Sequence, residues 1–122
     1  MTIDDRVLLS CIIPARNEEG NIVRAIENLS KVLQASPSIP SYEIIPVDDN
    51  STDSTGALID NLAAGDSHVR PVHRTSSPGF GNAVKAGMRE ATGDIIVPFM
   101  GDLSDDPHDI PLLVEGIRKG YD

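Results

Sequence analysis

The chain has 122 residues and a formal net charge of −9, with 10 Lys plus Arg against 19 Asp plus Glu. A surface this acidic is not built to neutralise a phosphate backbone, so the composition argues against nucleic acid as a partner. The length fits one domain, and the single cysteine, Cys11, lies in an apolar run. We therefore expect a core thiol, no disulfide framework and a reducing compartment.

Four short apolar runs rich in Ile and Val have the length of β-strands. They span Val7 to Pro14, Tyr42 to Val47, Val69 to His73 and Ile95 to Met100. Their near-continuous hydrophobicity predicts strands that are buried on both faces. None approaches the roughly 18 apolar residues that span a bilayer. The polar start of the chain, Met1 to Arg6, lacks the order of a signal peptide, which predicts a cytoplasmic location.

Amphipathic segments follow each of the four strands and predict four helices. The residues expected on their inner faces are Ile22, Ile26, Leu29 and Leu33, then Leu58 and Leu62, then Val84, Met88 and Ala91, and finally Ile110, Leu113, Val114 and Ile117. Asn17 is expected to cap the first helix, and Ser51 or Thr52 the second. Pro107 is expected to open the fourth helix and Gly120 to end it.

This alternation predicts an α/β fold, in which a parallel sheet carries helices on both faces and the crossovers are right-handed. If the strands follow the order 3-2-1-4 of a mononucleotide-binding half, the first and fourth strands flank the point where the strand order reverses. Ligands bind there, at the carboxyl ends of the strands. We therefore expect the functional site at that edge of the sheet.

Acidic segments follow the first, second and fourth strands, at residues 14–19, 47–53 and 100–106. Asp, Asn and Ser are common in ordinary turns and helix caps, so one such segment alone carries little meaning. Three at one edge repel one another, which indicates a binding site. Carboxylates bind a cation or accept hydrogen bonds from a ligand, and an acidic site holds a diphosphate only through a bridging metal. The pattern favours a nucleotide sugar bound with Mg²⁺ or Mn²⁺.

Four ordered motifs resemble family 2 glycosyltransferases of the Rossmann-like GT-A fold, and among them the polyprenyl-phosphate sugar transferases, such as the dolichol-phosphate mannose synthases. The motifs run from Ile13 to Glu19, from Val47 to Thr55, from Gly79 to Ala83 and from Ala91 to Asp94. The resemblance covers the chain from Leu8 to its last residue. It implies that residues 1–122 are the truncated nucleotide-sugar-binding part of a longer domain, without its acceptor half.

The resemblance implies a nucleotide-sugar site made of Pro14, Ala15, Arg16, Glu18, Val47, Asp49, Met100, Gly101 and Asp102. In it, Glu18 contacts ribose or base, Val47 and Asp49 border the base, and Asp48 braces the loop. Arg16 stands where the family often has Tyr, so base stacking is replaced by a guanidinium contact or lost. The turn that begins at Gly79 leads into a helix beside the nucleotide.

The metal site departs from the family pattern. Members usually carry Asp-x-Asp after the fourth strand, whereas this chain has Met100, Gly101 and Asp102. Mg²⁺ often binds only one or two protein carboxylates, so Asp102 with Ser104 is expected to hold Mg²⁺ or Mn²⁺ weakly, or the site is lost. The same segment resembles a calcium loop, but Pro107 and Leu113 occupy the places of its Gly and Glu.

The sequence therefore predicts an inverting glycosyltransferase domain that binds a GDP- or UDP-sugar through a divalent metal for transfer to an acceptor such as a polyprenyl phosphate at a membrane surface. No catalytic residue is assigned, because the family's general base lies beyond Asp122, and the segment alone is expected to be inactive. An exposed sheet edge, where a next strand would pair, favours a homo-oligomer.

Three alternatives remain open. A nucleotide-binding or regulatory module without transfer is favoured by Met100. A dinucleotide-dependent oxidoreductase is disfavoured, because the glycine pattern at Gly79 to Val84 is incomplete and follows the third strand. An α/β domain whose acidic turns are only caps would bind no ligand. The scattered His68, His73 and His108 are expected to be surface or helix-start residues, not zinc ligands.

Overall fold

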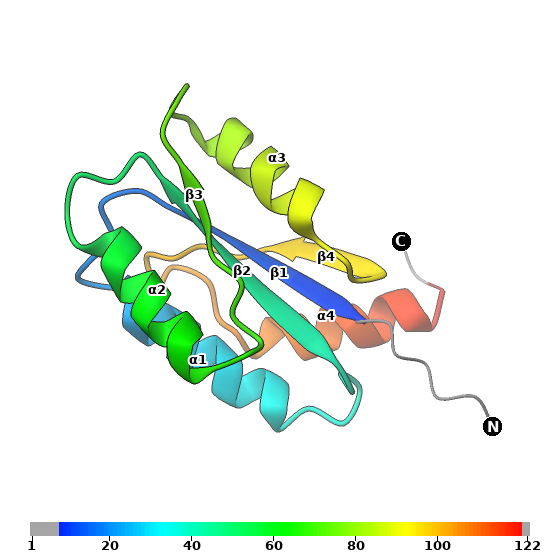
Figure 1. Ribbon diagram of the computed structural model, residues 1–122. Helices are drawn as coiled ribbons and strands as arrows, with labels where there is room; N and C mark the ends of the chain where they lie inside the picture. The colour runs from blue at the N-terminus through cyan, green and yellow to red at the C-terminus, as the bar shows by residue number, and fades with distance from the viewer. Residues whose placement is uncertain (1–7, 121–122) are drawn as a thin grey trace.

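The computed structural model describes residues 8–120 (Figure 1). The start of the chain at Met1 to Arg6 and the first residue of the first predicted strand, Val7, lie outside the described residues. The elements are β1 (Leu9–Ala15), α1 (Ile22–Gln34), β2 (Tyr42–Asp49), α2 (Thr55–Gly65), β3 (Val72–Arg74), α3 (Phe80–Glu90), β4 (Ile95–Pro98) and α4 (Asp109–Arg118). This is the alternating order that the hydrophobic pattern predicts.

All strand pairs in the sheet are parallel, and the strand order is β3-β2-β1-β4. The predicted order 3-2-1-4 is therefore confirmed, and β1 lies between β2 and β4. The third strand is shorter and later than predicted, because Val69 forms only an isolated bridge with Ile44. The carboxyl ends of β1, β2 and β4 meet at one edge, which brings the three acidic segments together (Figure 1).

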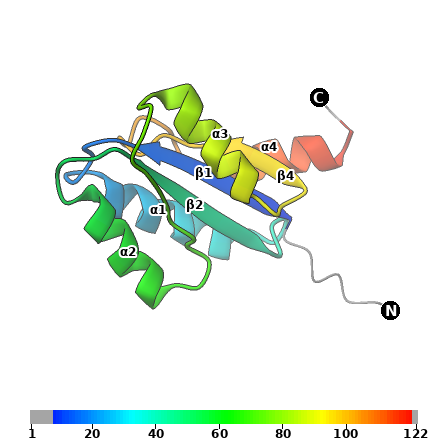
Figure 2. The same cartoon turned by 45° about the horizontal axis from the view of Figure 1, so that its top comes forward.

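Helices cover both faces of the sheet, as predicted: α3 lies on one face and α1, α2 and α4 on the other (Figure 2). Alternate side chains of β1 pack into the cores on the two faces of the sheet, because successive residues of a strand point in opposite directions. Cys11 packs in the larger core with α1, whereas Ile12 packs with Ala83 of α3. Cys11 is fully buried, which confirms it as a core residue, and this burial raises the pKa of its thiol to about 12.

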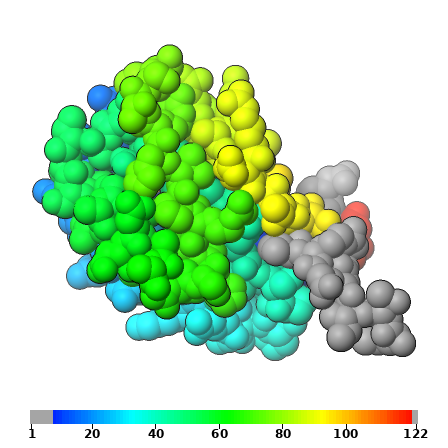
Figure 3. Space-filling view, viewed as in Figure 1, coloured from blue at the N-terminus to red at the C-terminus, as the bar shows by residue number. Residues whose placement is uncertain are grey.

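Strand burial differs from the prediction at the edges. β1 and β2 are buried along nearly their whole length, whereas β3 and β4 each contain exposed residues. Ile96 of β4 is 39% exposed. The prediction of burial on both faces is therefore wrong for β3 and β4, because an edge strand has a neighbour on one side only. Seen from the side of Figure 1, α2 and the segment leading into β3 hide most of the central strands (Figure 3).

The predicted inner face is confirmed for α1, whose Ile22, Ile26, Leu29 and Leu33 are all buried. In α2 the buried apolar residue is Ile59, while Leu58 and Leu62 are only partly buried. In α3 the prediction is wrong for Met88, which is exposed, while Ala83 and Gly87 are buried and the predicted Ala91 packs against the core in part. Small residues allow this helix to approach closely: a Cβ on Gly87 would lie 2.5 Å from Ile12 Cγ2.

The fourth helix is also only partly as predicted. Ile110 and Val114 are buried, but Leu113 and Ile117 are exposed, because α4 touches the rest of the described chain along a narrow stripe. The helix begins at Asp109, and Pro107 accepts a hydrogen bond from Ile110 in the preceding turn. Gly120 follows the helix with a φ of +92°, which confirms it as the stop. Within residues 8–120, no helix has the length and apolar character needed to cross a membrane.

Candidate functional site

The loop after β1 (residues 16–21, the β1 loop) is held by the loop after β2 and by the first residue of α2. Its successive amides donate to side chains across a gap of more than thirty residues. Asn17 N donates to Ser51 Oγ at 3.0 Å, Glu18 N to Thr55 Oγ1 at 2.8 Å and Glu19 N to Asp53 Oδ2 at 3.3 Å. The β1 loop therefore takes its shape from residues 50–54 (the β2 loop) and Thr55.

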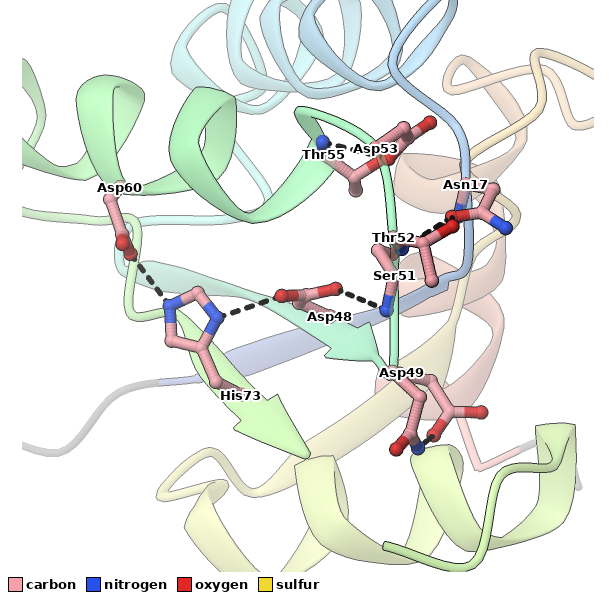
Figure 4. Close-up of polar contacts among 10 residues, drawn as sticks. Asn17, Asp48, Asp49, Ser51, Thr52, Asp53, Thr55, Asp60 and His73 are labelled. Carbon is pink, nitrogen blue, oxygen red and sulfur yellow. Dashed lines mark hydrogen bonds and ion pairs between the residues drawn. The ribbon is translucent and has the colours of Figure 1, made fainter. Parts of the chain in front are cut away.

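The contacts are reciprocal (Figure 4). Asn17 Oδ1 accepts from Thr52 N at 2.8 Å, and Glu19 Oε2 accepts from Ser54 N at 3.0 Å. The predicted helix caps are therefore wrong. Asn17 has a φ of +53° and bonds the other loop, and α1 begins at Ile22. Ser51 and Thr52 likewise bind the β1 loop, and α2 begins at Thr55.

Asp49 lies buried at the end of β2 and accepts three hydrogen bonds. Its donors are Arg74 Nη1 at 2.7 Å, Asn50 Nδ2 at 2.8 Å and Gly79 N at 2.8 Å. Burial opposes ionisation of this carboxyl, but the hydrogen bonds and the Arg74 charge outweigh it and lower the pKa of Asp49. Asp49 is therefore an anion at neutral pH that ties the turn at Gly79 to the end of β2.

Asp48 points to the other face of the sheet. Its Oδ1 accepts from Ser51 N at 3.2 Å. The role that the sequence predicts for Asp48, bracing the loop, agrees with this contact. Figure 4 shows Asp48 and Asp49 directed away from one another, so the two adjacent carboxylates bind different parts of the chain.

A pocket of about 230 Å³ opens at this edge between the β1 loop and the start of α3. It is lined by Pro14, Ala15, Arg16, Glu18, Asp49, Gly79, Phe80, Ala83 and Met100. Six of these are predicted site residues. Phe80 also lines the pocket and is 57% exposed, and the sequence pattern assigns it no role of its own within the Gly79 motif. An aromatic residue between two glycines of the Gly79 turn is the signal that could have found it.

The remaining predicted residues lie outside the pocket lining. Val47 is buried beneath it and packs with Ile12. Gly101 is buried and closely packed, because a Cβ there would lie 3.1 Å from Ile22 Cδ1 and 3.2 Å from Ile13 Cγ2, and these side chains would have to move slightly to admit it. Asp102 is exposed on the loop after β4. The structure thus brings together residues at the carboxyl end of β1, in the β1 loop and at the end of β2, and leaves Asp102 outside the pocket lining.

The loop after β4 (residues 99–108, the β4 loop) is held mainly by its own side chains. Asp102 Oδ1 accepts from Ser104 N at 3.0 Å, and Asp105 Oδ2 accepts from Met100 N at 2.9 Å. Hydrogen bonds from the side chain and amide of Ser104 lower the pKa of Asp102. Asp102 is therefore an exposed carboxylate that is ionised at neutral pH.

These residues can be tested for their fit to a divalent cation. Residues 8–120 contain no group of three or more His, Cys, Asp and Glu that could hold a metal ion. Mg²⁺ and similar ions do not require one, since they are often held by one or two carboxylates together with ligand phosphates and water. Asp102 with Ser104 fits a site of that kind, and Met100 offers no oxygen to it.

Comparison with known proteins agrees with this geometry. Residues 10–122 match the family Glycosyl transferase family 2. The chain is 37% identical over 116 residues to the undecaprenyl-phosphate 4-deoxy-4-formamido-L-arabinose transferase of Shewanella sediminis, covering 93% of this chain and 34% of that protein. It is 36% identical over 114 residues to the dolichol-phosphate mannosyltransferase of Pyrococcus furiosus, covering 93% and 31%.

A solved structure shares the fold. The mannosyltransferase PcManGT from Pyrobaculum calidifontis, in complex with GDP-Man and Mn²⁺, matches with a TM-score of 0.74 and 26% identity over 93% of this chain and 32% of that one. The expected Rossmann-like GT-A fold is thereby confirmed. The chain spans about a third of the length of these relatives. Because the family match begins at residue 10 and reaches the last residue, the chain belongs to glycosyl transferase family 2.

Proposed function

We propose that this chain forms the donor-binding part of a transferase that moves a sugar from a GDP- or UDP-sugar to a polyprenyl phosphate, working at a membrane surface as part of a longer protein. The observation that carries the proposal is the pocket in which Arg16, Glu18 and Asp49 meet at the carboxyl edge of the sheet. Family membership and the names of the relatives, which act on undecaprenyl phosphate and dolichol phosphate, support it.

Each charged residue of the pocket has a different role in binding the nucleotide. The Glu18 carboxylate accepts hydrogen bonds from ribose hydroxyls or from a base N–H. Asp49 already accepts three hydrogen bonds, and a carboxylate has about four acceptor positions, so it has room for one more at the border of the base. The Arg16 guanidinium brings a positive charge into a pocket that otherwise carries two negative ones.

Asp102 and Ser104 would hold the Mg²⁺ or Mn²⁺ that accompanies the donor. When bound, such an ion neutralises the charge of the diphosphate. Asp102 is suited to this because its lowered pKa keeps it charged and its exposure leaves it accessible. The chain supplies no assigned general base, and a polyprenyl phosphate needs none, since its attacking oxygen is already ionised.

A second candidate function is donor binding without transfer. The observation that favours it is Met100, which lines the pocket where the resembling enzymes usually have an acidic residue. A thioether is a poor ligand for Mg²⁺, so one carboxylate would have to serve alone. The two candidates differ in the reaction but share the donor site.

Calorimetric titration tests the shared site. The chain is titrated with GDP, UDP, GDP-mannose, UDP-glucose and NADH, each in Mn²⁺, in Mg²⁺ and in EDTA. We expect either the guanine ligands or the uracil ligands to bind, and we expect their affinity to fall in EDTA. The substitution Glu18→Gln is expected to lower that affinity further. Glu27→Gln, which makes the same charge change on the exposed side of α1, is the matched control. Binding of NADH alone, or equal loss in both variants, would contradict the proposal.

Transfer itself is tested on the longer protein, if the chain is part of one. A radiolabelled donor and a short-chain polyprenyl phosphate are supplied, and the lipid product is separated by extraction. Formation of labelled lipid supports the transferase. Donor binding without any labelled lipid supports the binding module instead.

A further inference from the structure

The ends of β2 and β3 carry two acid–base pairs side by side. Asp48 lies opposite His73 in the strand register, and Asp49 lies opposite Arg74. Because successive residues point to opposite faces of a sheet, the two pairs face different helices. The Asp49–Arg74 pair faces the start of α3, where Gly79 completes it, and the Asp48–His73 pair faces α2.

The imidazole of His73 bridges two carboxylates (Figure 4). Its Nδ1 lies 3.0 Å from Asp48 Oδ2, and its Nε2 lies 2.8 Å from Asp60 Oδ1 on α2. A neutral imidazole donates from one nitrogen only, whereas the imidazolium donates from both. Both contacts are therefore satisfied together only in the protonated ring. We call this group, His73 with Asp48 and Asp60, the His73 clasp.

The clasp reaches the pocket through a short series of contacts. The second oxygen of Asp48 accepts from Ser51 N at 3.2 Å. Ser51 Oγ in turn accepts from Asn17 N at 3.0 Å, and Asn17 lies between the pocket residues Arg16 and Glu18. The orientation of Asp48 thus determines where the β2 loop holds the β1 loop.

The packing of α2 leaves Asp48 little freedom. A Cβ on Gly56, in the first turn of this helix, would lie 2.5 Å from Asp48 Oδ2 and 3.5 Å from His73 Cε1. The charged groups that face the imidazole are Asp48 from β2 and Asp60 from α2. Arg74 and Asp49 lie on the other face of the sheet and are paired with each other. The surroundings of His73 therefore favour its cation.

We propose that protonated His73 is a positioning residue for the nucleotide pocket. It holds Asp48 in place, and through Asp48 it holds the β1 loop, so that donor affinity falls as His73 loses its proton. This rests on the proposed function. Hydrogen bonds from the ring to Asp48 and Asp60 raise the pKa of His73 above its ordinary value. A raised pKa means that the clasp is complete at low pH and is lost as pH rises through that value.

The affinity for GDP and UDP, measured by calorimetry between about pH 5.5 and pH 9, tests the proposal. We expect the wild type to lose affinity by about fivefold as His73 deprotonates. His73→Gln is expected to bind with a flat profile over this range. His68→Gln is the matched control, because His68 stacks on Tyr42 at the start of β2, and its profile is expected to match the wild type.

Asp60→Asn separates positioning from a general structural effect. Asp60 is exposed and does not line the pocket, so its loss alone does not remove a ligand contact. Removing its charge lowers the pKa of His73, and the midpoint of the affinity profile is expected to move to lower pH by the same amount. A wild-type profile that is flat, or a midpoint that stays in place in Asp60→Asn, would overturn the proposal.

Two measurements without a nucleotide keep this proposal distinct from the proposed function. The NMR titration of the His73 ring gives its pKa directly in the wild type and in Asp60→Asn. Hydrogen exchange of the Asn17 and Ser51 amides, measured relative to the intrinsic exchange rate at each pH, is expected to quicken above that pKa and at all pH values in His73→Gln. If exchange quickens in His73→Gln but no nucleotide binds to the wild type, the clasp is supported and the donor site is refuted. If exchange in His73→Gln equals that of the wild type, the clasp is refuted.

Discussion

The acidic segments after β2 and after β4 have similar compositions but are held in different ways. At the end of β2 and in the loop that follows, the carboxylates of Asp48, Asp49 and Asp53 accept hydrogen bonds from other elements as well as from nearby residues. After β4, Asp102, Asp105 and Asp106 bond amides within five residues of themselves. The first segment supports the pocket, which Asp49 lines, and the second leaves Asp102 as an exposed carboxylate.

The same shift in pKa therefore has different consequences at the two places. The pKa is lowered for Asp49 against the effect of burial, because Gly79, Asn50 and Arg74 bond its charged form. The pKa is also lowered for Asp102, which is exposed, mainly by hydrogen bonds from the side chain and amide of Ser104. Solvent screens the second case, so the stability of the fold depends on Asp49 and not on Asp102.

The largest expected effect is that of Asp49→Ala. This change leaves the Arg74 charge and the Gly79 amide without their partner, and removing one member of a buried pair lowers the free energy of unfolding by about 3 kcal/mol. Asp102→Ala is expected to change it by less than about 0.5 kcal/mol. Urea unfolding followed by circular dichroism measures both, and equal losses would remove the contrast between the two segments.

Asp102→Asn tests the other side of the comparison. We expect the variant to bind GDP or UDP about tenfold more weakly than the wild type in Mn²⁺, a loss of about 1.4 kcal/mol. In EDTA the two are expected to bind alike, because the carboxylate then has no ion to hold. Calorimetry gives both affinities, and an unchanged affinity in Mn²⁺ would argue against any metal role of Asp102.

The response to acid sharpens the comparison further. A group whose pKa is lowered by folding contributes stability above its unfolded pKa, and this is lost as pH falls through the folded value. Replacing Asp49 by Asn is expected to make the loss of stability below about pH 4 smaller, because the variant has no carboxylate to protonate there. The Asp102→Asn variant is expected to keep a nearly wild-type acid profile. Urea midpoints measured at a series of pH values decide the matter.

The smallest expected effect concerns the edge of the sheet. β3 and β4 are the edge strands of the sheet, and β4, which pairs with β1, has no strand on its far side among residues 8–120. We propose that this edge associates weakly with a second copy of the chain, because unpaired edges are templates for other strands. Ile96→Lys is expected to abolish the association. Size exclusion with light scattering over a range of concentrations tests this, and a wild type that stays monomeric at every concentration counts against it.

Much of the site could be anticipated from sequence, since its residues follow strands directly. Pro14, Arg16, Glu18 and Asp49 line one pocket because the carboxyl ends of neighbouring parallel strands meet. His73 shows the opposite case. It is a surface residue, as predicted, but its two carboxylate partners lie 25 and 13 residues away. No local pattern marks such a bridge.

The periodicity of apolar residues by itself determined the alternating elements, the buried face of α1 and the edge at which the acidic segments gather. Those features depend on spacing along the chain, which the fold preserves. Only the tertiary structure decided that Asn17 and Ser51 bridge two loops instead of capping helices, and that Met88 is exposed while Gly87 is buried. The reason is physical. A polar side chain forms hydrogen bonds with whichever partners the packed chain brings near it, and the face of a helix that packs most closely on the sheet is the face that becomes buried.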